Sequence, residues 1–254
     1  MRILDKIFRR IYAYCMILSH QKKYKKVTYL FLKKNSDTLI VSFAGFSGMG
    51  KPPRYNYIDS LKEMQASRLY ILDNHGYDKA GSYYLGEQGD WYLKDQIIEL
   101  VSQIKREYNI EKSVFLGSSK GGVAAIYYGI QCKADIVISG APQYHLGTYL
   151  SKDGLKPILE SIVGGVDSAC VEKLNGVVRD LILSTKDASV KIYLHYSPYE
   201  HTYPEHIKDL IHDLKISGYK VEEDNCYEYT EHSSVGRYFI PYMKKILNEF
   251  QGQV

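Results

Sequence analysis

The chain has 254 residues, 45% of them hydrophobic and 24% charged, with a formal net charge of +4. This composition excludes a disordered or fibrous chain and is typical of a globular protein with one large core. No apolar run approaches the roughly 20 residues that cross a bilayer, so we expect no membrane span. The cysteines have no paired spacing, which predicts free thiols, no metal site and no cofactor; they are Cys15, Cys132, Cys170 and Cys226.

Positive charge is concentrated in residues 1–34, which hold ten Lys and Arg against the single acidic residue Asp5. Apolar residues in this segment recur at helical spacing: Ile3, Leu4, Ile7, Phe8, Ile11, Cys15 and Leu18. The pattern predicts a basic amphipathic helix in an N-terminal arm, residues 1–26. Two roles stay open for it. The helix contacts an anionic membrane surface or acidic assembly proteins, or it docks on its own domain with a solvated basic face.

The charged residues of this segment also indicate where the protein is located and which partners it has. Asp5, Lys6, Arg9 and Arg10 interrupt any signal-peptide core, so we expect a cytoplasmic protein, peripheral at the membrane if the arm binds there. Because the basic excess is confined to one arm, no nucleic-acid partner is expected.

Beyond the arm, strand-like and helical segments alternate along residues 27–254. Expected strands cover 27–33, 38–45, 68–73, 113–117, 134–139, 190–196 and 219–224. Expected helices cover 91–108, a segment starting at Ser119, 204–217 and 234–250, with a helical insertion at about 150–187. A short polar turn joins the first two strands and predicts a hairpin. The alternation predicts one α/β domain, with a mostly parallel sheet covered by helices on both faces.

The stretch "FLGSSKGG" contains the pattern G-x-S-x-G centred on Ser119. An apolar run precedes it and small apolar residues follow, as in a sharp strand-to-helix turn that exposes a nucleophilic serine. The five-residue pattern is common by itself, so this context carries the prediction. The amide of Lys120, at the helix start, is then placed to stabilise an oxyanion.

The order of nucleophile, acid and histidine along α/β-hydrolase chains indicates the other two residues. His232 lies between the last expected strand and the closing helix and is the expected base. Glu200 follows the strand 190–196 and is the expected acid, which orients the imidazole and stabilises its protonated form. Glu205 and Asp224 are rivals for the role of acid.

Two more loops follow strand ends, which face the site in such sheets. "FAGFSGMG" is expected to supply the second oxyanion donor, the amide of Phe46 or of Gly45. Residues after the strand 68–73 are expected to line a substrate cleft: Asp73, His75, Tyr83 and Tyr84. The 25 tyrosines of the chain favour a glycan substrate, because tyrosine rings stack on sugar faces. The alternative is that the tyrosine content reflects only the composition of the lineage.

With these residues in place, the segment 27–250 resembles the α/β-hydrolase superfamily. More narrowly, "FAGFSGMG", "LYILDNHG", "GSYYLG" and "FLGSSKGG" are similar to two bacterial groups. One is the accessory Sec system family that modifies glycans on serine-rich adhesins, and the other comprises capsular polysaccharide biosynthesis proteins of the XcbB/CpsF type. The resemblance implies acetyl or acyl chemistry on carbohydrate at the cytoplasmic membrane face, with Glu as the triad acid. Accessory Sec proteins are much longer, so their extra domains and partner contacts do not carry over.

We therefore expect a serine esterase or acyltransferase acting on a glycan or glycoconjugate, with Ser119, His232 and Glu200 as its triad. Either water or a sugar hydroxyl resolves the acyl-enzyme, and the sequence leaves both open. The alternative comes from another class: a non-catalytic hydrolase-fold protein. It would bind glycan or a membrane-associated assembly or secretion complex through residues 1–34.

Overall fold

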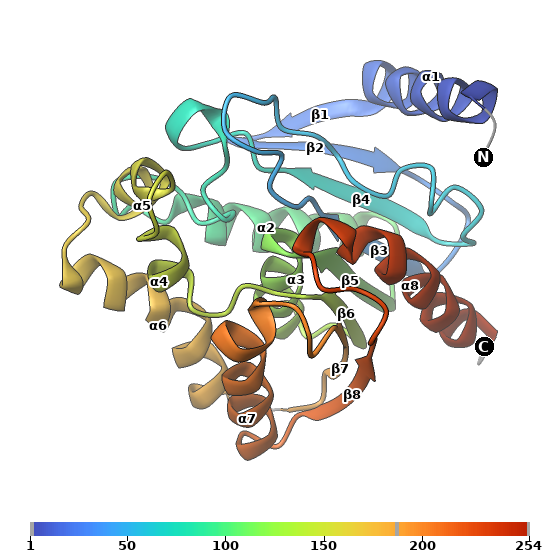
Figure 1. Ribbon diagram of the computed structural model, residues 1–254. Coiled ribbons are helices and arrows are strands. Elements are labelled where there is room, and N and C mark those ends of the chain that lie inside the picture. Colours follow the sequence, from blue (N-terminus) through green and yellow to red (C-terminus); the bar gives the residue numbers. More distant parts are fainter. Residues whose placement is uncertain (1–2, 186–187, 253–254) are drawn as a thin grey trace.

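The computed structural model describes residues 3–185 and 188–252, without the side chains of residues 3–6 and 9. Within these residues, eight strands form one sheet in the order β1-β2-β4-β3-β5-β6-β7-β8 (Figure 1). The strands are β1 Gln21–Tyr24, β2 Val27–Leu32, β3 Thr38–Phe43, β4 Ser67–Leu72, β5 Lys112–Ser118, β6 Ile136–Gly140, β7 Lys191–Tyr196 and β8 Lys220–Asn225. Pairing is parallel from β4 through β3 and β5 to β8, which confirms the predicted mostly parallel sheet.

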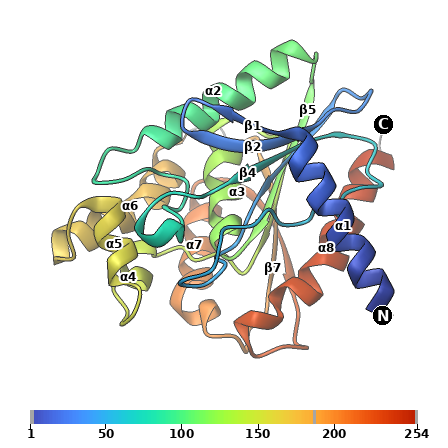
Figure 2. The same ribbon diagram turned by 90° about the horizontal axis from the view of Figure 1, so that it is seen from above.

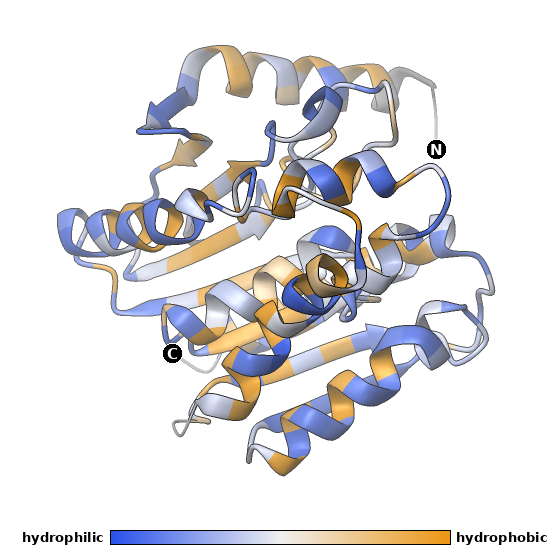
Figure 3. Ribbon diagram, turned by 90° about the vertical axis from the view of Figure 1, so that its left-hand side faces the viewer, coloured by the Kyte–Doolittle hydropathy of each residue, from blue (hydrophilic) through white to orange (hydrophobic). Residues whose placement is uncertain are grey.

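Helices cover both faces of the sheet, as predicted. They are α1 Ile3–His20, α2 Tyr92–Glu107, α3 Lys120–Gln131, α4 Leu146–Leu150, α5 Lys156–Val163, α6 Ser168–Ser184, α7 Lys208–Ile216 and α8 Val235–Gly252. Seen from above, α1 and α8 lie on one side of the sheet, and α2, α3 and α7 lie on the other (Figure 2). The central strands are mostly apolar, whereas the helices carry both polar and apolar residues along their length (Figure 3). Burial of the sheet between two helical layers explains this difference.

The predicted hairpin of the first two long strands is wrong. β2 pairs antiparallel with β4, and β3 lies on the far side of β4. Residues 33–37 pass over the start of β4 instead of making a tight turn. The hydroxyl of Ser67 fastens them there, because it accepts from Lys34 N at 3.0 Å and donates to Lys34 O at 3.1 Å. All six residues of β3 are buried, as suits a strand with a parallel neighbour on each side.

The sheet also begins earlier than expected. Residues 21–24, which we placed in the arm, form β1 and pair antiparallel with β2. Lys25 has a φ of 51° in the turn between them. The turn is held to α2 by an ion pair of Lys25 with Glu99 and by the Lys26 amide, which donates to Gln96 Oε1 at 2.9 Å. Only α1 of the expected arm therefore stands outside the sheet.

The helical insertion expected at about 150–187 lies between β6 and β7 and comprises α4, α5 and α6. Its first helix starts at Leu146, earlier than expected, and residues 186–187 lie outside the described residues. Two backbone hydrogen bonds of 2.8 Å, from Gln88 N to Ser161 O and from Gly89 N to Ile162 O, join it to the loop that follows β4. The insertion is thus attached to the loops at the carboxyl ends of the strands. Within the described residues, no helix combines the length and the apolar character needed to span a bilayer.

Candidate active site

Ser119 stands on the sharp turn between β5 and α3. Its backbone has φ 56° and ψ −123°, a conformation that side-chain-bearing residues rarely adopt. Glycines make the close approach possible: a Cβ at Gly117 would lie 2.2 Å from Gly121 O, and one at Gly121 would lie 2.4 Å from Phe43 O. The strand-to-helix turn inferred from the sequence is therefore present, with the serine at its apex.

Three side chains from distant parts of the chain meet at this turn. His232 Nε2 lies 2.8 Å from Ser119 Oγ, and His232 Nδ1 lies 3.2 Å from Glu200 Oε1. Glu200 stands in the turn after β7, and His232 opens a short 3₁₀ turn, His232–Ser234, directly before α8. The arrangement has the geometry in which an imidazole takes a proton from a hydroxyl while a carboxylate holds the opposite ring nitrogen.

Glu200 is held as a charged carboxylate. Burial alone would raise its pKa, but hydrogen bonds from His232 and Thr202 and the nearby His201 outweigh burial, so the pKa of Glu200 lies below its ordinary value. The Thr202 amide donates to Oε1 at 3.3 Å, and the Thr202 hydroxyl donates to Oε2. An ionised carboxylate here stabilises an imidazolium on His232.

The two rival acids have other partners. Glu205 Oε2 lies 2.6 Å from Lys152 Nζ, and Asp224 Oδ2 lies 2.6 Å from His195 Nδ1. Of the three carboxylates considered in the sequence, Glu200 is the one that contacts His232.

The expected oxyanion donors border Ser119 from two sides. Lys120 is the first residue of α3, where a backbone amide has no partner within the helix. The loop after β3 runs beside the turn that carries Ser119, since a Cβ on Gly45 would lie 3.5 Å from Ser118 O. Phe46 follows in that loop and is half-buried. The oxyanion role of these amides stays a prediction.

Tyr84 anchors the loop that carries Gly45. Its hydroxyl accepts from Ala44 N at 2.6 Å and donates to Ala44 O at 3.0 Å. Asp73 in turn accepts from Tyr84 N at 3.2 Å and from Lys120 Nζ at 2.9 Å. One buried carboxylate thus connects the segments on which both expected oxyanion donors lie.

The four residues expected to line a substrate cleft contact other parts of the chain. Asp73 and Tyr84 are buried in the contacts just described, and Tyr83 is buried with its hydroxyl donating to Gln143 Oε1 at 2.8 Å. His75 Nε2 lies 3.0 Å from Lys26 O and its Nδ1 lies 3.3 Å from the Tyr92 hydroxyl. These contacts fix loops around the site, and direct contact with substrate stays a prediction.

Two neighbours of the site were not found by sequence reasoning. The Tyr57 hydroxyl lies 2.7 Å from Ser118 Oγ, burial raises the pKa of Tyr57 to about 12, and its φ of 66° marks a constrained loop. His201 Nε2 lies 3.1 Å from Glu200 Oε1. Adjacency to Glu200 was the signal available for His201, whereas nothing in the loop between β3 and β4 indicated Tyr57.

Comparison with known proteins complements this geometry. No protein-family model matches the chain, and no curated protein matches it by sequence. Solved structures do match. The capsule O-acetyltransferase of Neisseria meningitidis serogroup A is 19% identical with a TM-score of 0.75, and the match covers 90% of this chain and 93% of that chain. A variant of that enzyme with one histidine replaced by alanine, solved in complex with CoA, matches with the same TM-score of 0.75.

Two further structures extend the comparison. The Gap123 glycosylation-associated protein complex from Streptococcus agalactiae has 19% identity and a TM-score of 0.72, covering 90% of this chain and 46% of that chain. The fluorophosphonate-binding serine hydrolase FphF of Staphylococcus aureus has 12% identity and a TM-score of 0.62, covering 90% and 95%. Likeness at these identities shows a shared fold. The chain therefore has the α/β-hydrolase fold that its sequence predicted.

Proposed function

We propose that the chain is a serine acyltransferase or esterase that acts on a glycan or glycoconjugate in the biosynthesis of bacterial surface polysaccharide or glycoprotein. The observation that carries the chemistry is the hydrogen-bonded row Ser119–His232–Glu200 on a strained strand-to-helix turn. The glycan substrate is supported by the similar structures, a capsule O-acetyltransferase and a glycosylation-associated complex.

Each of these residues has a distinct role in the reaction. Ser119 Oγ attacks the acyl carbonyl while His232 Nε2 takes its proton, and Glu200 stabilises the resulting imidazolium. Negative charge on the carbonyl oxygen is bound by the Lys120 amide and by the amide of Phe46 or Gly45. The tetrahedral intermediate collapses to an acyl-Ser119 ester, and His232 returns the proton to the leaving group. His232 then deprotonates the acceptor hydroxyl, which attacks the ester. As the bond to Ser119 Oγ breaks, His232 returns this proton to Oγ and the free serine is restored.

The acceptor decides between transfer and hydrolysis, because a sugar hydroxyl gives an acylated glycan and water gives a free acid. A thioester of CoA is the donor class that the similar structures support, since one of them holds CoA. With such a donor, the C–S bond of the thioester breaks as the acyl-Ser119 ester forms, and the CoA thiolate takes the proton from His232.

The nucleophile is tested by covalent labelling. We expect a fluorophosphonate probe to label the full chain and to label Ser118→Ala, but not Ser119→Ala, because His232 activates only the serine it contacts. The adjacent serines make a matched pair, which intact-mass analysis and fluorescence in a gel distinguish. Labelling of Ser119→Ala would reject Ser119 as the nucleophile. Absence of labelling in the folded parent chain would support the alternative, a non-catalytic binding protein.

The arm carries a second part of the proposal, on location. α1 packs on the domain through one narrow side; the packed residues are Tyr12, Ala13, Met16 and Ile17. Its other side exposes large apolar side chains: Ile7, Phe8, Ile11, Tyr14 and Leu18, each 46% to 69% exposed. The side chains of Ile3 and Leu4, from the same expected stripe, lie outside the described residues. The helix thus docks on its own domain and still leaves most of the predicted stripe uncovered.

Basic residues adjoin this exposed apolar side. Arg10 is exposed on α1, and Lys22 and Lys23 are exposed on β1, which follows α1 directly. An apolar helix face beside cations fits the interface of an anionic bilayer, where apolar side chains enter the acyl boundary and lysines meet headgroups. We therefore assign the arm to an anionic membrane surface.

Liposome sedimentation tests this assignment. The chain is expected to sediment with phosphatidylglycerol vesicles at low salt and to be released at high salt. Lys22→Glu/Lys23→Glu should weaken binding at least about tenfold, since each cation near an anionic surface contributes roughly 1 kcal/mol. A control reversal at Lys208 in α7 and Lys220 in β8, the strand at the other end of the sheet from β1, should have no effect. Equal binding to neutral and anionic vesicles, or none, would reject the membrane and favour a protein partner.

A further inference from the structure

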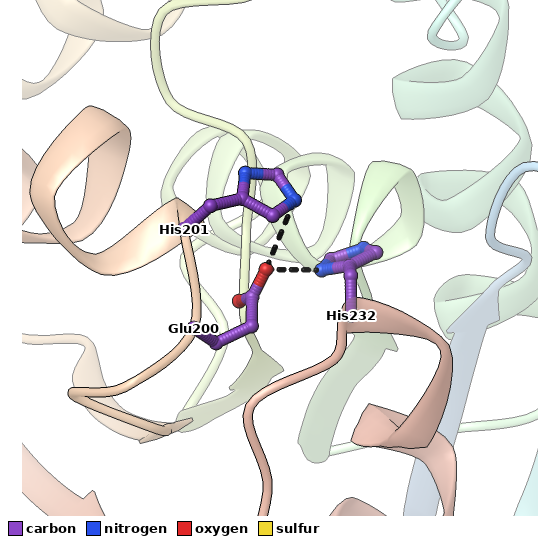
Figure 4. Close-up of side chains that lie close together, drawn as sticks. All are labelled: Glu200, His201 and His232. Carbon is purple, nitrogen blue, oxygen red and sulfur yellow. Dashed lines mark hydrogen bonds and ion pairs between the residues drawn. The ribbon is translucent and has the colours of Figure 1, made fainter.

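The triad acid is shared by a second histidine. Glu200 Oε1 lies 3.2 Å from His232 Nδ1 and 3.1 Å from His201 Nε2, so both rings point at the same carboxylate (Figure 4). One nitrogen or oxygen atom from each of the three residues lies within 4.8 Å of the others. The Glu200 side chain is fully buried, whereas His201 is 49% exposed. The cluster is therefore open to solvent on the side of His201.

Each member is oriented by a contact on its far side. His201 Nδ1 lies 3.4 Å from Glu205 Oε2, which Lys152 also contacts. His232 Nε2 faces Ser119, and the second oxygen of Glu200 accepts the Thr202 hydroxyl. When His201 Nδ1–H donates to Glu205, the lone pair on Nε2 faces the lone pairs of Glu200 Oε1. Two acceptors at 3.1 Å require a proton or a cation between them.

We propose that Glu200, His201 and His232 bind a divalent cation of the zinc class, and that this cation reversibly blocks the reaction at Ser119. Zinc favours imidazole nitrogen and carboxylate oxygen at about 2.0–2.2 Å, so tetrahedral ligands stand roughly 3.3–3.6 Å apart, close to the two separations seen here. A carboxylate on the far nitrogen of a ligating histidine, as Glu205 provides for His201, is a regular feature of zinc sites. Magnesium and calcium prefer all-oxygen sites and are not expected.

The cation blocks the reaction at Ser119 because it binds His232 through Nδ1. A cation bound to Nδ1 needs a lone pair on that nitrogen. A neutral imidazole has a lone pair on Nδ1 only in the tautomer whose proton is on Nε2. One proton therefore moves from Nδ1 to Nε2, and the number of protons on the ring does not change. Nε2 then donates to Ser119 Oγ and cannot accept its proton, so the serine stays unactivated. The cation also neutralises the charge of Glu200 that would stabilise an imidazolium. Removal of the cation restores the original tautomer.

Direct binding tests the site without reliance on activity. Titration calorimetry with Zn²⁺ and the absorption spectrum of bound Co²⁺ are measured on the metal-free full chain. We expect one strong site per chain, binding to Ser119→Ala as to the parent, and at least tenfold weaker binding to His201→Ala. His212→Ala, which removes another exposed histidine on α7, serves as the matched control. The parent and all variants carry Cys15→Ser, because Cys15 is an exposed free cysteine and thiolates are zinc ligands.

Turnover of an activated acetyl ester then tests whether the cation blocks the reaction at Ser119. This part of the proposal rests on the proposed function. Each variant's rate with Zn²⁺ is divided by its own metal-free rate. Inhibition is expected in the parent and in His212→Ala, with reversal by EDTA, and the inhibitory concentration should rise at least tenfold in His201→Ala. Zinc binding that depends on His201 in a chain without turnover would uphold the site and reject the enzyme. Turnover with no such binding, or inhibition unchanged in His201→Ala, would overturn the site.

Discussion

Replacement of Ser119 by alanine is expected to lower kcat for an activated acetyl ester by about 10⁴-fold or more. His232→Ala should cost a similar factor, because a serine hydroxyl is a poor nucleophile until the imidazole takes its proton. The double variant should be hardly slower than either single variant, since the two side chains act as one unit across their 2.8 Å contact. Steady-state rates of the four proteins measure this non-additivity.

Glu200→Gln measures the contribution of the expected triad acid to kcat. The amide keeps an oxygen near His232 Nδ1 but loses the negative charge that stabilises the imidazolium, so a loss of about 10²–10⁴ in kcat is expected. Glu205→Gln removes a carboxylate that contacts Lys152 from the following helical segment, Tyr203–Ile207. It is the matched control and should have a far smaller effect on kcat. The triad would be contradicted if the double variant lost kcat by the product of the two single factors. It would also be contradicted if Glu200→Gln and Glu205→Gln lowered kcat equally.

Lys120→Met is expected to destabilise the fold by about 3–5 kcal/mol. The Lys120 and Asp73 side chains are 3% and 0% exposed, and removal of the cation leaves a buried carboxylate without its counter-charge. Asp73 also holds Ser82, whose amide donates at 2.9 Å, so the loop after β4 should loosen with it. Urea unfolding followed by circular dichroism gives the free energy of unfolding.

A double-mutant cycle isolates the interaction free energy between Lys120 and Asp73 from the contributions of their other contacts. Lys120→Met combined with Asp73→Asn should be less destabilising than the sum of the single changes, because the double variant buries no unpaired charge. The surface pair Lys62–Asp59, 3.0 Å apart, is the control, and its removal should change the free energy of unfolding by less than about 1 kcal/mol. A Lys120→Met variant as stable as the parent would show that Asp73 needs no counter-charge.

The strand-to-helix turn at Ser119 was accessible to sequence reasoning because its signals are local. An apolar run, a glycine-flanked serine and a small-residue helix follow one another within a few residues, and together they indicate one structure. His232 and Glu200 were assigned from chain order after strands that also carry local signals. The pairing of β2 with β4 could not be inferred in this way, since it depends on where residues 33–37 travel in space.

Burial of polar groups was the other limit of sequence reasoning. Asp73 follows a strand end, a position typical of cleft residues, and only the fold shows that Lys120 and Tyr84 enclose it. The proximity of His201 to His232 is hidden for the same reason, since the two rings come from loops that precede and follow β8 in the chain. The apolar stripe of α1 was visible in the sequence, whereas the choice of Tyr12 and Met16 for the docked side required the position of the domain.

The two strands at the ends of the sheet carry exposed charges. β1 presents Lys22 and Lys23, and β8 presents Lys220, Glu222 and Glu223 to solvent. Lysines and other charges on an outer strand oppose the addition of a further strand from another molecule. Both ends of the sheet are thereby protected against edge-to-edge growth, and fibrous association through backbone pairing is disfavoured. Any self-association at high concentration should therefore proceed through helix contacts and should dissolve in mild detergent.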